Sequence, residues 1–147
     1  MEEEPLLEPG LHDFELGEIG NHFLEDFADS TTRPALIANL EAYAKLFLDL
    51  GASVELWLDG SFTTKKVDPN DIDLVVFSSE AEVNALPPRE QSLLKALLDH
   101  ATIKKRFGLD VYFCVAENQQ MRSYWRGWFG FDRNEEPKGI ARIMVAT

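Results

Sequence analysis

The sequence predicts a single-domain α/β (α+β) protein in which helices flank a mixed β-sheet. Its 147 residues are enough for one domain with a hydrophobic core and too few for two. Apolar residues make up 45% of the chain and charged residues 27%, as in ordinary globular proteins. Strand-like and helix-like stretches alternate, and a helical stretch separates two predicted strands, which favours a crossover connection within one mixed sheet.

The N-terminal part of the chain has the composition of an arm. Residues 1–20 are rich in Glu, Pro and Gly and are expected to be extended, followed by a domain at residues 21–147. A few apolar residues are expected to anchor parts of this arm to the core. A short helix is predicted around Ile19, Phe23 and Phe27, which are spaced by four residues.

The middle of the chain contains the clearest periodic patterns. Apolar residues recur every three or four positions over residues 34–50, which predicts an amphipathic helix that ends at Gly51. Alternation at residues 54–58 and an apolar run at residues 71–77 predict two strands. The remaining predicted elements are a loop at residues 78–88, a helix ended by Gly108, a strand at about residues 109–116, a short helix at 117–125, an irregular aromatic segment at 124–131 and a strand at 139–145.

Three aspartates are the candidate metal ligands. Asp71 and Asp73 are two positions apart in a predicted strand, so their carboxylates point to the same side. Two such charges repel each other, and a hard divalent cation such as Mg²⁺ or Mn²⁺ removes the conflict. Asp110 opens the next predicted strand. If the two strands are neighbours, all three carboxylates converge at one end of the sheet.

A Gly-Ser pair precedes the aspartates and is the candidate phosphate site. Gly60 allows the backbone to approach a phosphate closely, and the Ser61 hydroxyl can donate a hydrogen bond to it. Lys65 and Lys66 follow in a polar loop, where they either reach phosphate oxygens or are merely solvated; Lys66 is the better candidate. Asp59 either contributes to the site or caps the turn. Carboxylates, metal and phosphate cradle together describe phosphoryl or nucleotidyl transfer.

These motifs resemble the signature of the DNA polymerase β-like nucleotidyltransferase superfamily. Within it, the chain is similar to a small, largely uncharacterised prokaryotic family of minimal, antitoxin-like nucleotidyltransferases, over residues 10–145. The matching stretches are residues 56–62, 69–73, 110–113 and 124–130. The resemblance implies a nucleotidyltransferase-like fold, a pair of divalent ions and a nucleoside triphosphate substrate.

The resemblance implies roles for six residues. Asp71, Asp73 and Asp110 would be the catalytic residues and the ligands of Mg²⁺ or Mn²⁺, and Gly60, Ser61 and Lys66 would bind the nucleotide phosphates. The predicted reaction moves a nucleoside monophosphate from the triphosphate to an acceptor hydroxyl on a protein, a small molecule or an RNA end. The alternative is a non-catalytic nucleotide-binding or antitoxin-like interaction module on the same fold.

The charge of the chain limits its partners. The net charge is −12, with 14 Lys and Arg against 26 Asp and Glu, whereas nucleic-acid-binding proteins normally present a basic face. We therefore expect a protein acceptor, such as a toxin partner, or a small molecule in preference to a long nucleic acid. No apolar run is long enough to cross a bilayer, the N-terminus is acidic where a signal peptide is basic, and Cys114 is the single cysteine. These features predict a cytoplasmic protein without a membrane partner.

The aromatic segment at residues 124–131 has two interpretations. Its rings could form a stacking platform for a base, with Arg126 contacting a phosphate or carboxylate. The alternative is a small satellite core, with Arg126 paired to an acidic residue, and this second interpretation is the preferred one. The three histidines show no metal-ligand spacing and are expected at the surface.

Overall fold

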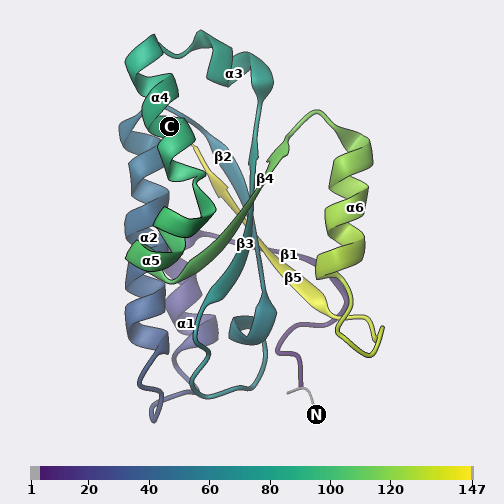
Figure 1. Ribbon diagram of the computed structural model, residues 1–147. Helices are drawn as coiled ribbons and strands as arrows, with labels where there is room; N and C mark the ends of the chain where they lie inside the picture. Colours follow the sequence, from purple (N-terminus) through teal and green to yellow (C-terminus); the bar gives the residue numbers. More distant parts are fainter. Residues whose placement is uncertain (1–3, 147) are drawn as a thin grey trace.

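One mixed sheet organises the molecule, as the sequence predicts; among the described residues it has five strands, one more than the four predicted (Figure 1). The computed structural model describes residues 4–146, so residues 1–3 of the predicted arm and residue 147 of the predicted domain lie outside the described residues. The spatial order of the strands is β1-β5-β2-β3-β4. The strands are β1 (Gly10–Phe14), β2 (Val54–Asp59), β3 (Ile72–Ser78), β4 (Leu109–Val115) and β5 (Gly139–Val145).

The pairing of the strands makes the sheet mixed. β2 is antiparallel to both of its neighbours, β3 and β5, whereas β3 pairs in parallel with β4. The parallel pair is the crossover predicted from the helical stretch between these two strands. In register, Asp73 of β3 lies beside both Asp59 of β2 and Asp110 of β4. Aspartates from three neighbouring strands therefore meet at one end of the sheet.

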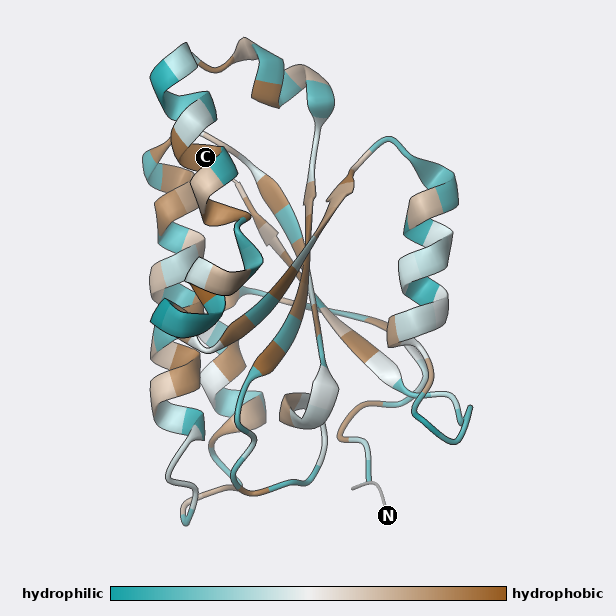
Figure 2. Ribbon diagram, in the orientation of Figure 1, coloured by the Kyte–Doolittle hydropathy of each residue, from teal (hydrophilic) through white to brown (hydrophobic). Residues whose placement is uncertain are grey.

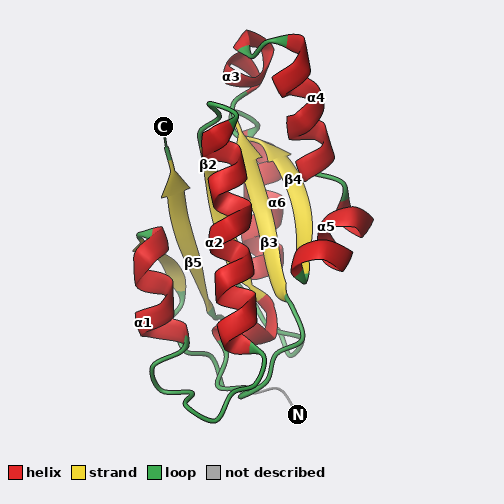
Figure 3. Cartoon of the chain, turned by 90° about the vertical axis from the view of Figure 1, so that its left-hand side faces the viewer, coloured by secondary structure: helices red, strands yellow, loops and turns green. Residues whose placement is uncertain are grey.

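The helices cover both faces of the sheet unequally. α1, α2, α4 and α5 lie on one face, and α6 lies on the other (Figure 1, and from the side in Figure 3). Hydrophobic residues recur along the strands and along α2, which packs on the larger core (Figure 2). A smaller core lies under α6. The helices are α1 (Ile19–Phe23), α2 (Arg33–Asp49), α3 (Glu80–Ala85), α4 (Pro88–Leu97), α5 (His100–Phe107) and α6 (Gln119–Phe129), with 3₁₀ turns η1 (Leu16–Glu18) and η2 (Gly60–Thr63).

Three predicted elements in the second half of the chain differ from the structure, and in the first half α1 ends at Phe23, before Phe27. The loop expected at residues 78–88 contains α3, because the Ser79 hydroxyl caps the backbone N–H of Glu82. The helix expected up to Gly108 is two helices, α4 and α5, with Asp99 at the N-terminal end of the second. The aromatic segment expected to be irregular belongs to α6, which begins after the N-cap Asn118 and is helical as far as Phe129.

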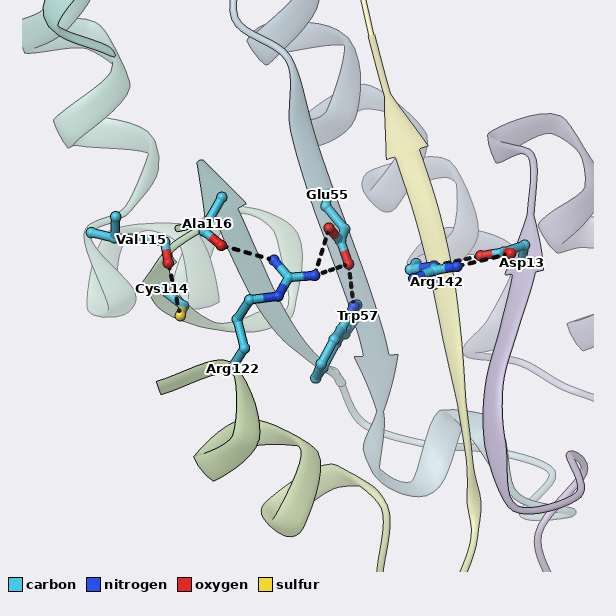
Figure 4. A network of polar contacts seen from close by, with 8 residues as sticks. All are labelled: Asp13, Glu55, Trp57, Cys114, Val115, Ala116, Arg122 and Arg142. Atoms are coloured by element: carbon cyan, nitrogen blue, oxygen red, sulfur yellow. Dashed lines mark hydrogen bonds and ion pairs between the residues drawn. The ribbon is translucent and has the colours of Figure 1, made fainter. Parts of the chain in front are cut away.

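The N-terminal arm contributes an edge strand that its composition did not indicate. β1 pairs in parallel with β5, from Gly10 beside Gly139 to Phe14 beside Ile143. The Arg142 guanidinium donates two hydrogen bonds to the Asp13 carboxylate across this pair (Figure 4). None of the helices in residues 4–146 has the length and apolar character needed to traverse a bilayer.

Candidate functional site

Asp71, Asp73 and Asp110, called the carboxylate triad below, come together at one end of the sheet. Asp71 directly precedes β3, and Asp73 and Asp110 are the second residues of β3 and β4. One carboxylate oxygen from each lies within 4.8 Å of the other two. Side chains alternate along a strand, and Val75 and Cys114 of the same strands lie in the core under α6. The triad therefore opens on the α6 side of the sheet.

The triad carries more negative charge than its surroundings compensate. Burial, and then the charges of Asp71 and Asp110, raise the pKa of Asp73 to about 6. Burial acts in the same direction on Asp110, but the Lys104 ammonium outweighs it and holds the pKa of that carboxyl below its usual range. A divalent cation would remove the remaining repulsion, and three carboxylates are the oxygen ligands that Mg²⁺ and Mn²⁺ accept. The residues present thus fit such an ion.

Lys104 supplies the positive charge at the triad in this structure. Its ammonium donates hydrogen bonds of 2.8 Å to Asp71 and 2.7 Å to Asp110. His100 is half-exposed, as predicted for a surface histidine, but its Nε2 lies 3.0 Å from Asp110. Both residues come from α5, which directly precedes β4. A metal ion shared by Asp71 and Asp110 would have to displace the Lys104 ammonium.

The Gly60 backbone is in contact with the triad. Gly60 has a φ of +81°, and a Cβ there would lie 2.7 Å from Oδ2 of Asp73. Both facts restrict the position to glycine, because L side chains rarely adopt this φ and no room exists for a methyl group. Ser61 follows within η2 and lines the same cleft. The Gly-Ser pair therefore begins a tight turn directly beside the carboxylates.

We expect Gly60→Ala to destabilise the fold more than Gly51→Ala does. Gly51 has a nearly equal φ of +78°, but a Cβ there would meet no atom within 4 Å. Both variants bear the strain of the left-handed backbone, roughly 1–2 kcal/mol, and only Gly60→Ala also pushes against Asp73. Urea denaturation of both variants measures the difference. Equal losses of stability would contradict the close packing of Gly60 on Asp73.

A buried arginine holds the backbone that follows Ser61. The Arg33 side chain is fully buried at the start of α2, and burial lowers its pKa to about 10. Its guanidinium donates hydrogen bonds to the carbonyls of Phe62, Thr64 and Lys66, and a further one to Phe23. The Arg33 hydrogen bonds thus fix the backbone of residues 60–66, called the 60–66 turn below. The sequence suggested a helix start at this position and gave no sign of this role.

The two loop lysines have different surroundings. Lys66 lines the cleft next to the triad, whereas the Lys65 ammonium lies 2.8 Å from a Glu4 carboxylate oxygen. All six residues predicted for the site, Gly60, Ser61, Lys66, Asp71, Asp73 and Asp110, therefore line one cleft of ≈ 1320 Å³.

Asp59 and Lys138 form a second charged pair on the floor of this cleft. Asp59 is 4% exposed, and its carboxylate lies 2.9 Å from the Lys138 ammonium. Burial raises the pKa of Asp59 to about 7 in spite of this lysine. The Thr63 hydroxyl donates to the same carboxylate, so Asp59 both steadies the turn and faces the cleft. Lys138 was not predicted: it precedes β5, and only the pairing of β5 with β2 brings it to Asp59.

Helix α6 forms the wall of the cleft opposite the triad. Arg122 fixes this helix to the sheet, since its guanidinium donates hydrogen bonds of 3.0 and 2.9 Å to the two Glu55 oxygens (Figure 4). Arg122, and not the predicted Arg126, makes this pair with an acidic residue; Arg126 lines a separate pocket of ≈ 290 Å³. Tyr124 and Trp128 line the cleft itself.

Comparison with protein families assigns the chain to a family. A family model matches residues 1–144, nearly the whole length. The chain belongs to the DUF6932 family. This family is described as one of unknown function. No curated protein and no solved structure matches the chain. The resemblance to nucleotidyltransferases therefore stays a prediction, and the site has to be interpreted from its own geometry.

Proposed function

We propose that the protein is a metal-dependent nucleotidyltransferase that transfers a nucleoside monophosphate from a nucleoside triphosphate to an acceptor hydroxyl, with release of pyrophosphate. The observation that carries this proposal is the position of the carboxylate triad against the Gly60–Ser61 turn in one cleft. Mg²⁺ or Mn²⁺ bound there would neutralise charge on the triphosphate and on the attacking oxygen. The resemblance of these motifs to polymerase β-like nucleotidyltransferases points the same way.

The residues of the chain have distinct tasks in this proposal. Asp71 and Asp73 would hold the ion or ions. Asp110 would either share the ion nearest the acceptor and so lower the pKa of the acceptor hydroxyl, or accept the proton of that hydroxyl. In the metal-free protein Lys104 holds the pKa of Asp110 below its usual range, so this carboxylate is ionised and available to the ion once the ammonium is displaced. Ser61 and the backbone N–H groups of its turn would orient the terminal phosphates, with Lys66 beside them.

The net charge of the protein narrows the class of acceptor that we propose. With a net charge of −12, the protein repels long polynucleotides, so we propose a hydroxyl on a partner protein, such as a toxin, or on a small molecule. The free, buried Cys114 suits a reducing compartment, and we propose a cytoplasmic location.

One observation favours a second candidate, a nucleotide-binding or antitoxin-like module without catalysis. Lys104 already bridges Asp71 and Asp110, so these two carboxylates are partly neutralised without any metal. If that bridge persisted when nucleotide is bound, the triad could not hold the ions that transfer requires.

Metal binding and label transfer test the two candidates. Titration of the protein with Mn²⁺, with and without a non-hydrolysable nucleoside triphosphate, should show nucleotide-assisted Mn²⁺ binding. Incubation with each α-labelled triphosphate and a cell lysate should then label an acceptor, in a reaction that chelator abolishes. Asp71→Asn is the matched negative variant. Absence of Mn²⁺ binding would refute the transferase, whereas nucleotide binding without transfer in any lysate fraction would favour the binding module.

We expect Ser61→Ala to weaken triphosphate binding while leaving the fold intact. The variant would lose one hydrogen bond from the Ser61 hydroxyl to a charged phosphate oxygen, which contributes roughly 1.5–3 kcal/mol to the binding free energy. Calorimetry with a non-hydrolysable triphosphate and Mn²⁺ measures the change. Ser92→Ala, on the exposed side of α4, is the control. Unchanged affinity in Ser61→Ala would mean that this side chain only completes the turn.

A further inference from the structure

The cleft has an aromatic side that the transfer chemistry does not use. Tyr124, Trp128 and Phe131, called the aromatic wall below, line it opposite the triad and are 49%, 63% and 46% exposed. We propose that the aromatic wall stacks against the base of a metal-bound nucleotide, so that this small domain recognises the nucleoside by itself. This inference rests on the proposed function and deepens it.

Exposure separates these rings from their neighbours in the sequence. Phe129, on the same helix, is 6% exposed and belongs to the core under α6, against which Trp125 packs. The satellite-core interpretation therefore describes Phe129 and Trp125 but not the aromatic wall. Single exposed apolar side chains are common on protein surfaces. Three aromatic side chains on one wall of a cleft mark a binding surface.

Two rings of the aromatic wall, those of Tyr124 and Trp128, pack against other aromatic rings in the ligand-free protein. The Tyr124 ring lies 5.1 Å from the Trp125 ring, and the Trp125 ring lies 5.0 Å from that of Tyr112 on β4. The Trp128 ring is 6.5 Å from that of Tyr124. Arg122 fixes the preceding turn of α6 to the sheet (Figure 4). A planar ligand would thus meet a prepared surface and would order few side chains.

Charge decides which part of a nucleotide lies on this wall. Among the described residues that line the cleft, six are carboxylates and three are basic. Phosphates would be repelled from such a lining except where metal and the 60–66 turn receive them. An uncharged planar base has no such penalty, and stacking on an aromatic ring is favourable for any base. The two ends of the cleft therefore fit the two ends of one nucleotide.

The backbone of α6 leaves room for the ring. Gly127 lies between Tyr124 and Trp128 along the chain and lines the cleft, and a Cβ at this position would meet no atom within 4 Å. A base can therefore approach the helix closely. Because stacking tolerates base identity and grows with ring area, we expect modest base preference, with purines bound more tightly than pyrimidines.

Trp128→Ala and two phosphate probes test the inference. In the presence of Mn²⁺, the wild type should bind a non-hydrolysable purine triphosphate about tenfold or more tightly than inorganic tripolyphosphate, since the base adds stacking. Trp128→Ala should lose about that factor for the nucleotide and nothing for tripolyphosphate. Met121→Ala, also exposed on α6 but outside the cleft lining, is the control and should bind both probes as the wild type does.

Gly127→Ala adds a test in which the fold is not at risk. Alanine is the better helix former, so folding stability should be kept or raised. The new methyl group would occupy the open space on the wall, so nucleotide affinity should fall several-fold with tripolyphosphate affinity unchanged. Wild-type nucleotide affinity in either Trp128→Ala or Gly127→Ala would overturn the stacking assignment. Failure of both probes to bind the wild type would instead refute the proposed function, and the inference with it.

Discussion

Asp110→Asn is expected to lower nucleotidyl transfer by at least about 100-fold, the effect typical of losing a proton-transfer group, while nucleotide affinity stays close to that of the wild type. Under the proposed function, Asp71 and Asp73 would still hold the nucleotide-bound metal in this variant. Asp110 would act chiefly in the transition state, and interactions realised only there change the rate without changing substrate binding. Label transfer to the lysate acceptor and calorimetry with a non-hydrolysable triphosphate measure the two quantities.

The control for this prediction is another ionised aspartate with a basic partner. Asp13 of the edge strand β1 pairs with Arg142 of β5, and neither residue lines the cleft. Asp13→Asn should therefore leave label transfer and nucleotide affinity unchanged. Wild-type transfer by Asp110→Asn would refute the role assigned to Asp110. An equal loss of nucleotide affinity and of transfer would make Asp110 a ground-state metal ligand instead.

Asp73→Asn should abolish Mn²⁺ binding and at the same time stabilise the metal-free protein. The amide cannot replace the carboxylate as a metal ligand of comparable strength. It also removes a charge whose ionisation the fold disfavours, since burial and the neighbouring aspartates raise the pKa of Asp73 to about 6. A shift of that size corresponds at most to roughly 3 kcal/mol, and solvent screening of this partly exposed group reduces it to about 1 kcal/mol.

The pH dependence of this stabilisation has a defined sign. Between the unfolded pKa near 4 and the folded pKa near 6, the folded protein binds more protons at Asp73 than the unfolded chain does. The contribution of Asp73 to the free energy of unfolding of the wild type is therefore lost as pH rises through that window. The advantage of Asp73→Asn over the wild type should be small at pH 4, grow up to about pH 6 and then stay constant.

Thermal unfolding in the presence of chelator measures this advantage at each pH. Asp13→Asn is a control of opposite sign. The hydrogen bond from Arg142 lowers the pKa of Asp13, so the ionised Asp13 stabilises the folded protein, and Asp13→Asn should destabilise it at pH values above the unfolded pKa of this carboxyl. A stability difference between Asp73→Asn and the wild type that is independent of pH would contradict the raised pKa. Retained Mn²⁺ affinity would remove the triad as the metal site.

Local sequence patterns located the three aspartates of the triad on their elements. Strand periodicity indicates where Asp73 and Asp110 lie within their strands, and the intervening helix favours a crossover between these strands but leaves open whether they are neighbours. The parallel pairing of β3 and β4, with Asp73 beside Asp110, is what the structure adds to these patterns. The Gly60–Ser61 turn is also local, because a strand end and a glycine with positive φ are encoded within a few residues.

The cationic side chains around the site could not be predicted in this way. Lys104 looks like an ordinary basic residue near a helix C-terminus, and its contact with Asp71 depends on how α5 packs beside β3 and β4. Lys138 reaches Asp59 only through the pairing of β2 and β5. The parallel partner of β1 is likewise distant in sequence. Each of these contacts depends on tertiary packing, for which a single sequence contains no local signal.

The hydrogen bonds that Arg33 donates determine how much of the protein a ligand must order. Fixing the backbone of a flexible loop costs about 1–2 kcal/mol per residue. In the 60–66 turn this cost is met during folding, because the carbonyls of Phe62, Thr64 and Lys66 are held by a buried guanidinium. The interaction free energy of a phosphate bound to this turn would then contribute fully to affinity. Under the proposed function, the phosphates would meet a turn that is already ordered, and ligand association would be limited by access to the cleft instead of by loop closure.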